Sequence, residues 1–202
     1  MCVSAVILAG GASRRMGRDK AWMEIGGRSL LQIARDKARA LGVAEIFISG
    51  RPGVDYSALG CPVLLDLEPD AGPLGGVERG LQACSAPLLL VLAVDLPCLT
   101  ADFLGRLLAG CDYLTGAVPK PGGRLQPLAA IYPRRCHALA LDALVNCRRS
   151  ASAFAEACLR ERAVRLVRVK SADEALFANW NSPDDCRQAP QITDNRNEQF
   201  HG

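Results

Sequence analysis

Short apolar runs alternate with amphipathic segments through the first half of the chain. Of all the features of the sequence, this alternation restricts the possible folds the most. The apolar runs have the length and composition of strands that are buried on both faces of a sheet. They span residues 3–9, 45–49, 62–66 and 88–94. The segments between them that predict helices span residues 29–41, 72–84 and 100–110. Alternating β and α units of this kind predict a mostly parallel sheet covered by helices on both faces, a three-layer α/β/α sandwich.

The second half of the chain is less regular. Residues 113–120 and 124–132 predict a hairpin, with Pro127 interrupting the second strand as it would at a sheet edge. Two helices are expected at 134–147 and 151–161, and a strand at 162–169. We expect a single domain over residues 1–186. Residues 187–202 are polar and predict a disordered tail.

Charge and cysteine content exclude several classes of protein. The net charge of +3 over 202 residues gives no reason to expect a nucleic-acid partner. The apolar stretch PLLLVLAV is far too short to span a membrane. The nine cysteines lie at least eleven residues apart, without the CxxC-type spacing of zinc sites or redox pairs. Most fall in apolar runs, so we interpret them as small core residues of a reduced, cytoplasmic protein.

The segment LAGGASRRMGRDK, residues 8–20, follows the first predicted strand. Loops at the carboxyl end of a strand hold ligands in open α/β sheets. Gly10 and Gly11 allow backbone amides to approach an anion. Positive charge comes from Arg14, Arg15, Arg18 and Lys20. The segment therefore predicts a polyphosphate site, with a glycine turn carrying solvated arginines as the alternative. It is neither GxxxxGK[ST] nor GxGxxG, so it is not a P-loop or a classical dinucleotide fingerprint.

This segment resembles the signature loop of the molybdenum cofactor guanylyltransferases, which are nucleotidyltransferases with a Rossmann-like fold. The resemblance extends to about residue 186. It implies the transfer of GMP from GTP to Mo-molybdopterin with release of pyrophosphate, and Mg²⁺ as cofactor, with Mn²⁺ as a substitute. It also makes proteins that handle the cofactor candidate partners. Related enzymes that use CTP tend to read LAAG where this chain reads LAGG, which is consistent with a purine base.

Asp95 follows the most apolar predicted strand, in the sequence AVDLP. A carboxylate at the end of such a strand needs a cation or hydrogen-bond donors nearby. The resemblance makes it the Mg²⁺ ligand, which agrees with the usual arrangement of one carboxylate plus substrate phosphates. The alternative is a turn or cap residue before Pro97.

Three further segments are assigned mainly by the resemblance. Asp66 would accept hydrogen bonds from guanine, and Gly75 in GPLGG would lie beneath the base, although GPLGG also predicts an ordinary proline-initiated helix. Asn179 and Asn181 in NWNSP would support the active site, and Gln126 would face the acceptor. From sequence alone, a helix cap with a neighbouring turn is the better interpretation of NWNSP, and only the resemblance favours a role in the site. We expect Trp22 and Trp180 to pack in the core, and we see no metal-ligand partner for His137 at a suitable spacing.

The resulting prediction is a Mg²⁺-dependent guanylyltransferase. The alternatives are a related transferase for another base or acceptor (a molybdopterin cytidylyltransferase, a cobinamide-phosphate guanylyltransferase or a sugar-phosphate nucleotidyltransferase) and a GTP-binding protein without turnover. The predicted catalytic residues are Arg15, Lys20 and Asp95. The predicted nucleotide-binding residues are Leu8, Ala9, Gly10, Gly11, Ser13, Arg14, Lys20, Asp66, Gly75 and Asp95. The predicted residues for the acceptor or for site support are Gln126, Asn179 and Asn181.

Overall fold

The structure is a computed structural model that describes residues 2–9, 20–65 and 71–180. Its main strands are β1 (Val3–Leu8), β4 (Ile46–Gly50), β5 (Val63–Leu65), β6 (Leu88–Ala93), β7 (Gly116–Lys120), β8 (Ala129–Pro133) and β9 (Val164–Arg168). Its α-helices are α1 (Leu30–Ala40), α2 (Pro73–Ala83), α3 (Ala101–Ala109), α4 (His137–Val145) and α5 (Ala151–Arg160). Short elements are β2 (Glu24–Ile25), β3 (Arg28–Ser29), η1 (Lys20–Trp22), η2 (Ser57–Leu59), η3 (Pro121–Gly123), η4 (Arg134–Cys136) and η5 (Ser171–Phe177).

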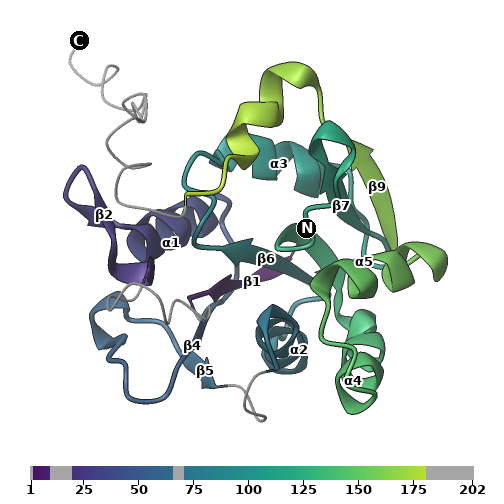
Figure 1. Cartoon of the computed structure of the whole chain (residues 1–202), viewed down its shortest axis with the longest axis horizontal. Helices are drawn as coiled ribbons and strands as arrows, with labels where there is room; N and C mark the ends of the chain where they lie inside the picture. Colours follow the sequence, from purple (N-terminus) through teal and green to yellow (C-terminus); the bar gives the residue numbers. More distant parts are fainter. Residues whose placement is uncertain (1, 10–19, 66–70, 181–202) are drawn as a thin grey trace.

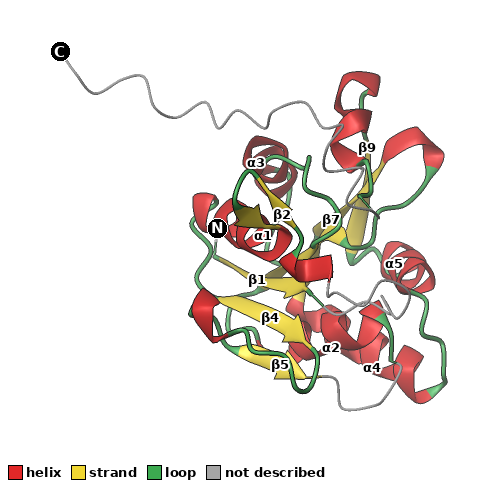
Figure 2. Cartoon of the chain, turned by 60° about the vertical axis from the view of Figure 1, so that its left-hand side comes forward, coloured by secondary structure: helices red, strands yellow, loops and turns green. Residues whose placement is uncertain are grey.

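The seven main strands form one sheet in the order β5-β4-β1-β6-β8-β7-β9. β8 is antiparallel to both of its neighbours, while the pairs β4–β5, β1–β4, β1–β6 and β7–β9 are parallel. Figure 1 shows α1 and α3 on one face of this sheet and α2, α4 and α5 on the other. The mostly parallel three-layer α/β/α sandwich predicted from the sequence is therefore confirmed. Figure 2 shows β1, β4 and β5 side by side between the two helical layers.

The core is divided by the sheet, as the alternation of side chains along a strand requires. Val6 and Leu8 of β1 point into the cluster formed with α2 and α5, whereas Ala5 and Ile7 point to the opposite face. All six residues of β1 are buried, which explains why its sequence does not alternate between apolar and exposed polar residues. The one polar residue, Ser4, donates a hydrogen bond of 2.6 Å to Glu45.

The predicted helix boundaries agree with the structure because they depend on local chemistry. Ser29 caps α1 in a complete capping box with Gln32, and Gly42 follows the helix with a positive φ of 67°. Pro73 occupies the first turn of α2, and the Thr100 side chain accepts a hydrogen bond from the Phe103 amide at the start of α3.

The prediction for Gln126 and Pro127 was wrong in its secondary structure. Both residues lie in the loop between β7 and β8, and the strand begins only at Ala129. Proline has no N–H to donate to a ladder, so β8 starts after it. β8 is also an internal strand between β6 and β7, so the edge-strand alternative is wrong as well.

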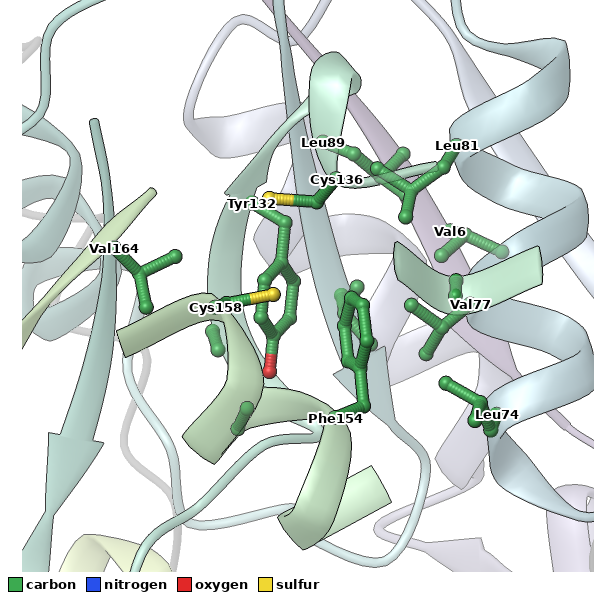
Figure 3. Packing of buried hydrophobic residues seen from close by; sticks show 14 of the residues in the cluster. Val6, Leu74, Val77, Leu81, Leu89, Tyr132, Cys136, Phe154, Cys158 and Val164 are labelled. Carbon is green, nitrogen blue, oxygen red and sulfur yellow. The ribbon is translucent and has the colours of Figure 1, made fainter. Parts of the chain in front are cut away.

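A buried side chain, Tyr132, holds the loop between β7 and β8 in place by a hydrogen bond. Tyr132 of β8 is fully buried and packs against Phe154 of α5, with ring centroids 5.0 Å apart (Figure 3). Its hydroxyl group donates a hydrogen bond of 2.9 Å to the Pro127 carbonyl oxygen. Burial raises the pKa of Tyr132 well above its usual value, so the phenol stays a donor. This bond fixes the loop that enters β8.

The eight described cysteines are free thiols in different environments. Cys84, Cys111, Cys136 and Cys158 are buried, as expected for core residues, while Cys2 and Cys147 are exposed. The interpretation of the cysteines as core residues therefore holds for only some of those that the structure describes. None of the described helices is both long and apolar enough to cross a membrane. The predicted tail, residues 187–202, lies outside the described residues.

Candidate active site

The chain crosses from one side of β1 to the other within its first half. From β1 it passes through α1 to β4 and then to β5, and it returns through α2 to β6 on the far side of β1. The strands that follow β1 and β6 along the chain therefore lie on opposite sides of this pair: β4 beside β1, and β7 and β8 beyond β6. Such a switch point is where open α/β sheets bind ligands.

Asp95 lies at this point, two residues after the end of β6. Its Oδ2 atom is 3.6 Å from the Nζ atom of Lys20, which begins η1. The Asp95 side chain is 35% exposed and that of Lys20 is 18% exposed, so both remain accessible to a ligand. The structure thus brings together two of the three predicted catalytic residues. The third, Arg15, lies outside the described residues.

Both described residues that flank segment 10–19 lie near Asp95. Ala9 follows Leu8, whose carbonyl oxygen accepts a hydrogen bond of 3.4 Å from the Val94 amide, and Lys20 contacts Asp95 directly. Leu8 and Ala9 accordingly lie at the switch point, and their role in nucleotide binding stays a prediction. The other predicted phosphate-binding residues lie outside the described residues: Gly10, Gly11, Ser13, Arg14 and Arg15.

The start of α2 packs closely against the ends of β1 and β4. Gly75 is buried in the first turn, and its amide donates to the Gly72 carbonyl oxygen at 3.1 Å. A Cβ atom on the next residue, Gly76, would lie 2.7 Å from the Leu8 side chain and would also meet Ser49. Gly75 therefore lies near the end of β1. Asp66, predicted to contact the base, lies outside the described residues.

Two further segments border the site through backbone hydrogen bonds. The Ala93 amide donates to the Leu128 carbonyl oxygen at 2.8 Å, which places the loop containing Gln126 beside the end of β6. The Trp180 amide donates to the Asp95 carbonyl oxygen at 3.0 Å, which places exposed Asn179 next to the loop of Asp95. Asn181 lies outside the described residues. Trp180 itself is 5% exposed, so the prediction that it packs in the core is confirmed.

Sequence reasoning missed one residue that contacts this loop. The Nζ atom of Lys37 in α1 donates hydrogen bonds to the carbonyl oxygens of Leu96, at 3.3 Å, and Pro97, at 2.6 Å. A signal was present, because Lys37 falls on the same helical stripe as Leu30, Ala34 and Leu41. A lysine on an apolar stripe that faces a strand end is unusual enough to be noticed.

His137 also has a partner that its sequence context does not reveal. Its Nε2 atom is 2.6 Å from Oε1 of Glu78, a buried carboxylate of α2.

The other predicted core aromatic, Trp22, stacks on Tyr56 with ring centroids 6.0 Å apart. Its contact with the core around α1 agrees with the prediction.

The arrangement at the switch point is suited to binding an anionic ligand together with a hard cation. A partly exposed carboxylate and an ammonium group lie side by side at the end of a parallel strand. No group of three or more His, Cys, Asp or Glu side chains within the described parts of the chain could hold a metal ion. A single carboxylate nevertheless suits Mg²⁺, which keeps waters or takes phosphate oxygens as its remaining ligands.

Fold and site together define a class, that of Rossmann-like α/β proteins whose ligand site lies at the switch point of the sheet. Residues 5–169 match the model of the MobA-like NTP transferase domain, and the chain belongs to this family.

Similar proteins cover nearly the whole chain. It is 37% identical to a protein of Opitutus terrae named "probable molybdenum cofactor guanylyltransferase", over 91% of this chain and 92% of that protein. It is 32% identical to the molybdenum cofactor guanylyltransferase of Xanthomonas euvesicatoria pv. vesicatoria, over 90% of each chain. The fold matches the crystal structure of molybdopterin-guanine dinucleotide biosynthesis protein A from Archaeoglobus fulgidus with a TM-score of 0.69. That match has 22% identity and covers 91% of this chain and 95% of the other.

Proposed function

We propose that the protein transfers GMP from GTP to the terminal phosphate of Mo-molybdopterin, forming the guanine dinucleotide cofactor and releasing pyrophosphate. The names of the similar proteins support these two substrates. The observation on this chain that carries the proposal is the Lys20–Asp95 pair at the switch point, 3.6 Å apart. It supplies one cation and one carboxylate where the triphosphate of a bound nucleotide would lie.

The proposed reaction is an in-line displacement at the α-phosphorus of GTP. An oxygen of the acceptor phosphate forms a new bond to this phosphorus, and the bond from the α-phosphorus to the oxygen bridging to the β-phosphorus breaks. Pyrophosphate leaves with the electron pair of that bond. Because the attacking phosphate oxygen is already anionic near neutral pH, the reaction needs no general base. Catalysis then depends on positioning and on neutralising negative charge.

Asp95 is the proposed Mg²⁺ ligand. Its carboxylate fits this role because it is a hard oxygen donor, is partly exposed and stands at a strand end. Mg²⁺ bound there would orient phosphate oxygens and withdraw charge from the leaving group. Lys20 would hold the Asp95 carboxylate before the nucleotide binds and contact the β- and γ-phosphates afterwards. Arg15 and the amides of residues 10–15 keep the phosphate-binding role that the family resemblance implies.

Recognition of the base and the acceptor is proposed on the same basis. Asp66 would accept hydrogen bonds from the N1–H and N2 amino groups of guanine, and Gly75 would lie under the ring. Gln126 and Asn179, whose segments border Asp95, would contact or support the acceptor side, as would Asn181. We also propose a cytoplasmic location, where the free cysteines would stay reduced.

The test combines nucleotide binding with turnover. Thermal shifts with Mg²⁺ and GTP, CTP, UTP or ATP should show the largest stabilisation for GTP, since a ligand at a hundred times its Kd adds about 2.7 kcal/mol. Pyrophosphate release should then require both GTP and Mo-molybdopterin. Asp95→Asn should abolish release, while Glu156→Gln, which changes an exposed carboxylate on α5, should leave it unchanged. Stabilisation by CTP in place of GTP would contradict the proposed base.

A further inference from the structure

The loop after Asp95 is anchored by a side chain from the opposite side of the switch point. Lys37 of α1 donates to the carbonyl oxygens of Leu96 and Pro97, the two residues that directly follow Asp95. Hydrogen bonds from a charged donor are roughly twice as strong as those between neutral groups. The ammonium group therefore fixes two consecutive peptide units beside the proposed metal ligand.

Lys37 occupies this position in unfavourable surroundings. It keeps some surface exposure, yet enough protein surrounds the ammonium group for desolvation to lower its pKa from 10.5 to about 8. The pocket around it is lined mainly by aliphatic side chains of α1, of β6 and of the loop that follows β6, among them Ile33, Leu92 and Val94. For folding alone, an apolar side chain would suit such a pocket at least as well. The positive charge of Lys37 is therefore best explained by its hydrogen bonds to the carbonyl oxygens of Leu96 and Pro97.

The remaining anchors of the loop show what Lys37 adds. The Asp95 carbonyl oxygen accepts from the Trp180 amide at 3.0 Å, and the Leu99 amide donates to Leu96 at 3.2 Å. Val94 is held by Leu8 through the 3.4 Å hydrogen bond already described. These bonds fix the backbone before and at Asp95 and the turn after it. Lys37 is the side chain that connects residues 96 and 97 to α1.

We propose that Lys37 is a positioning residue of the active site: by holding the carbonyl groups of Leu96 and Pro97, it fixes the backbone from which the Asp95 carboxylate acts. Its ammonium group donates to backbone oxygens of the two residues that follow Asp95, so it acts through the loop. This inference rests on the proposed role of Asp95 as the ligand of Mg²⁺.

The test uses the full-length protein and three substitutions. Lys37→Met removes the charge and the donors with little change in volume, and Lys37→Arg retains both. Arg39→Met removes an exposed cation from the same helix and serves as the matched control. The measurements are kcat and KM with GTP and Mo-molybdopterin, the Mg²⁺ concentration for half-maximal rate, and amide hydrogen exchange of residues 94–100 in the protein without ligands.

We expect Lys37→Met to lower kcat by about tenfold to a hundredfold, the usual loss when a group that orients a metal ligand is removed. The Mg²⁺ requirement should rise, the KM for GTP should change less than threefold, and exchange at 94–100 should become faster. Lys37→Arg should restore part of kcat, and Arg39→Met should match the wild type in every measurement.

Faster exchange at 94–100 with unchanged kcat and Mg²⁺ dependence would overturn the proposal, because Lys37 would then be purely structural. Unchanged exchange would overturn it as well. If Lys37→Met does not fold, Lys37→Gln takes its place, since the amide of glutamine carries no charge. Wild-type values of kcat, Mg²⁺ requirement and hydrogen exchange for Lys37→Gln would overturn the proposal. Hydrogen exchange needs no substrate. A wild-type protein that releases no pyrophosphate would therefore contradict the proposed function separately from this inference.

Discussion

Lys20 and Asp95 meet across the switch point of the sheet, with Nζ 3.6 Å from Oδ2, although one follows the loop after β1 and the other follows β6. Both side chains keep part of their surface exposed, so solvent screens the pair and it adds at most about 1 kcal/mol to stability. The position of the pair at the carboxyl ends of two parallel strands is better explained by ligand binding than by folding.

Replacement of Lys20 by alanine should therefore separate activity from stability. We expect the rate of pyrophosphate release to fall by about 10²-fold, the typical loss of a group that stabilises developing negative charge. The free energy of unfolding should change by less than about 1 kcal/mol. Steady-state kinetics and urea denaturation of the same preparation measure both. A Lys20→Ala enzyme with near-normal turnover would exclude the proposed role.

The contact between α2 and the sheet makes a second prediction, for stability. A Cβ atom on Gly80 would lie 2.8 Å from Cγ1 and 2.9 Å from Cβ of Val6, in the middle of the central strand β1. Because Val6 is β-branched and fully buried, it cannot move aside easily. We expect Gly80→Ala to destabilise the protein by about 1–3 kcal/mol, although alanine favours helix formation.

Gly105 provides the matched control for this substitution. It also lies within a helix, α3, but a Cβ atom there would meet only the Leu41 side chain at an ordinary contact distance of 3.7 Å. Gly105→Ala should therefore be neutral or should stabilise the protein by up to about 1 kcal/mol. Equal effects of the two substitutions in urea denaturation would refute the packing argument.

The parts of this structure that local chemistry determines could be predicted from the sequence. The Ser29 cap, the Pro73 start and the apolar strands depend on neighbouring residues, and they were predicted within a few residues. Asp95 was identified because a carboxylate ending an apolar strand is conspicuous. Gln126 was assigned to a strand because apolar residues surround it, but the missing N–H of Pro127 delays the start of β8.

The contacts that could not be predicted join residues far apart in the chain. Lys37 reaches Leu96 and Pro97 only because α1 packs against β1, the neighbour of β6 in the sheet, and Glu78 reaches His137 only because α2 packs beside α4. Spacing along one helix cannot reveal a partner on another. Such polar contacts between elements have to be taken from the structure.

The Glu78–His137 pair leads to a third prediction. Glu78 is only 4% exposed, so removal of its partner leaves a buried carboxylate without a compensating group. His137→Ala should lower the free energy of unfolding by about 2 kcal/mol. The double variant Glu78→Leu/His137→Leu should recover most of this loss, because two apolar groups of similar shape can replace a hydrogen-bonded pair with little cost. Urea denaturation of Glu78→Leu, His137→Leu and the double variant measures the coupling, and simple addition of the two single effects would argue against it.

The cysteines lead to a fourth prediction, on thiol reactivity. Burial raises the pKa of Cys111 to about 11 and also raises the pKa of Cys84. A hydrogen bond with Cys136, together with burial, raises the pKa of Cys158, so few thiolates form at these three positions at pH 8. Cys2 and Cys147 are exposed. Among the cysteines of residues 2–9, 20–65 and 71–180, iodoacetamide at pH 8 should therefore modify Cys2 and Cys147 first, with the buried ones protected until the protein unfolds. Mass spectrometry of peptides over a time course measures the order, and early modification of Cys111 would contradict the structure.

The lowered pKa of Lys37 leads to a last prediction, on the pH dependence of stability. Desolvation is the main cause of the decrease to about 8, Arg28 adds to it, and Cys98 opposes it. Between about pH 8 and 10.5 the unfolded chain therefore holds a proton on Lys37 that the folded protein has released. Stability rises with pH wherever the unfolded state binds more protons, here by at most about 1.4 kcal/mol per pH unit. Other groups titrate in this range too, so the informative quantity is the difference between the wild type and Lys37→Met. The wild type should gain stability relative to the variant from pH 8 to 10.5, and parallel urea-denaturation profiles for the two proteins would show that Lys37 titrates normally.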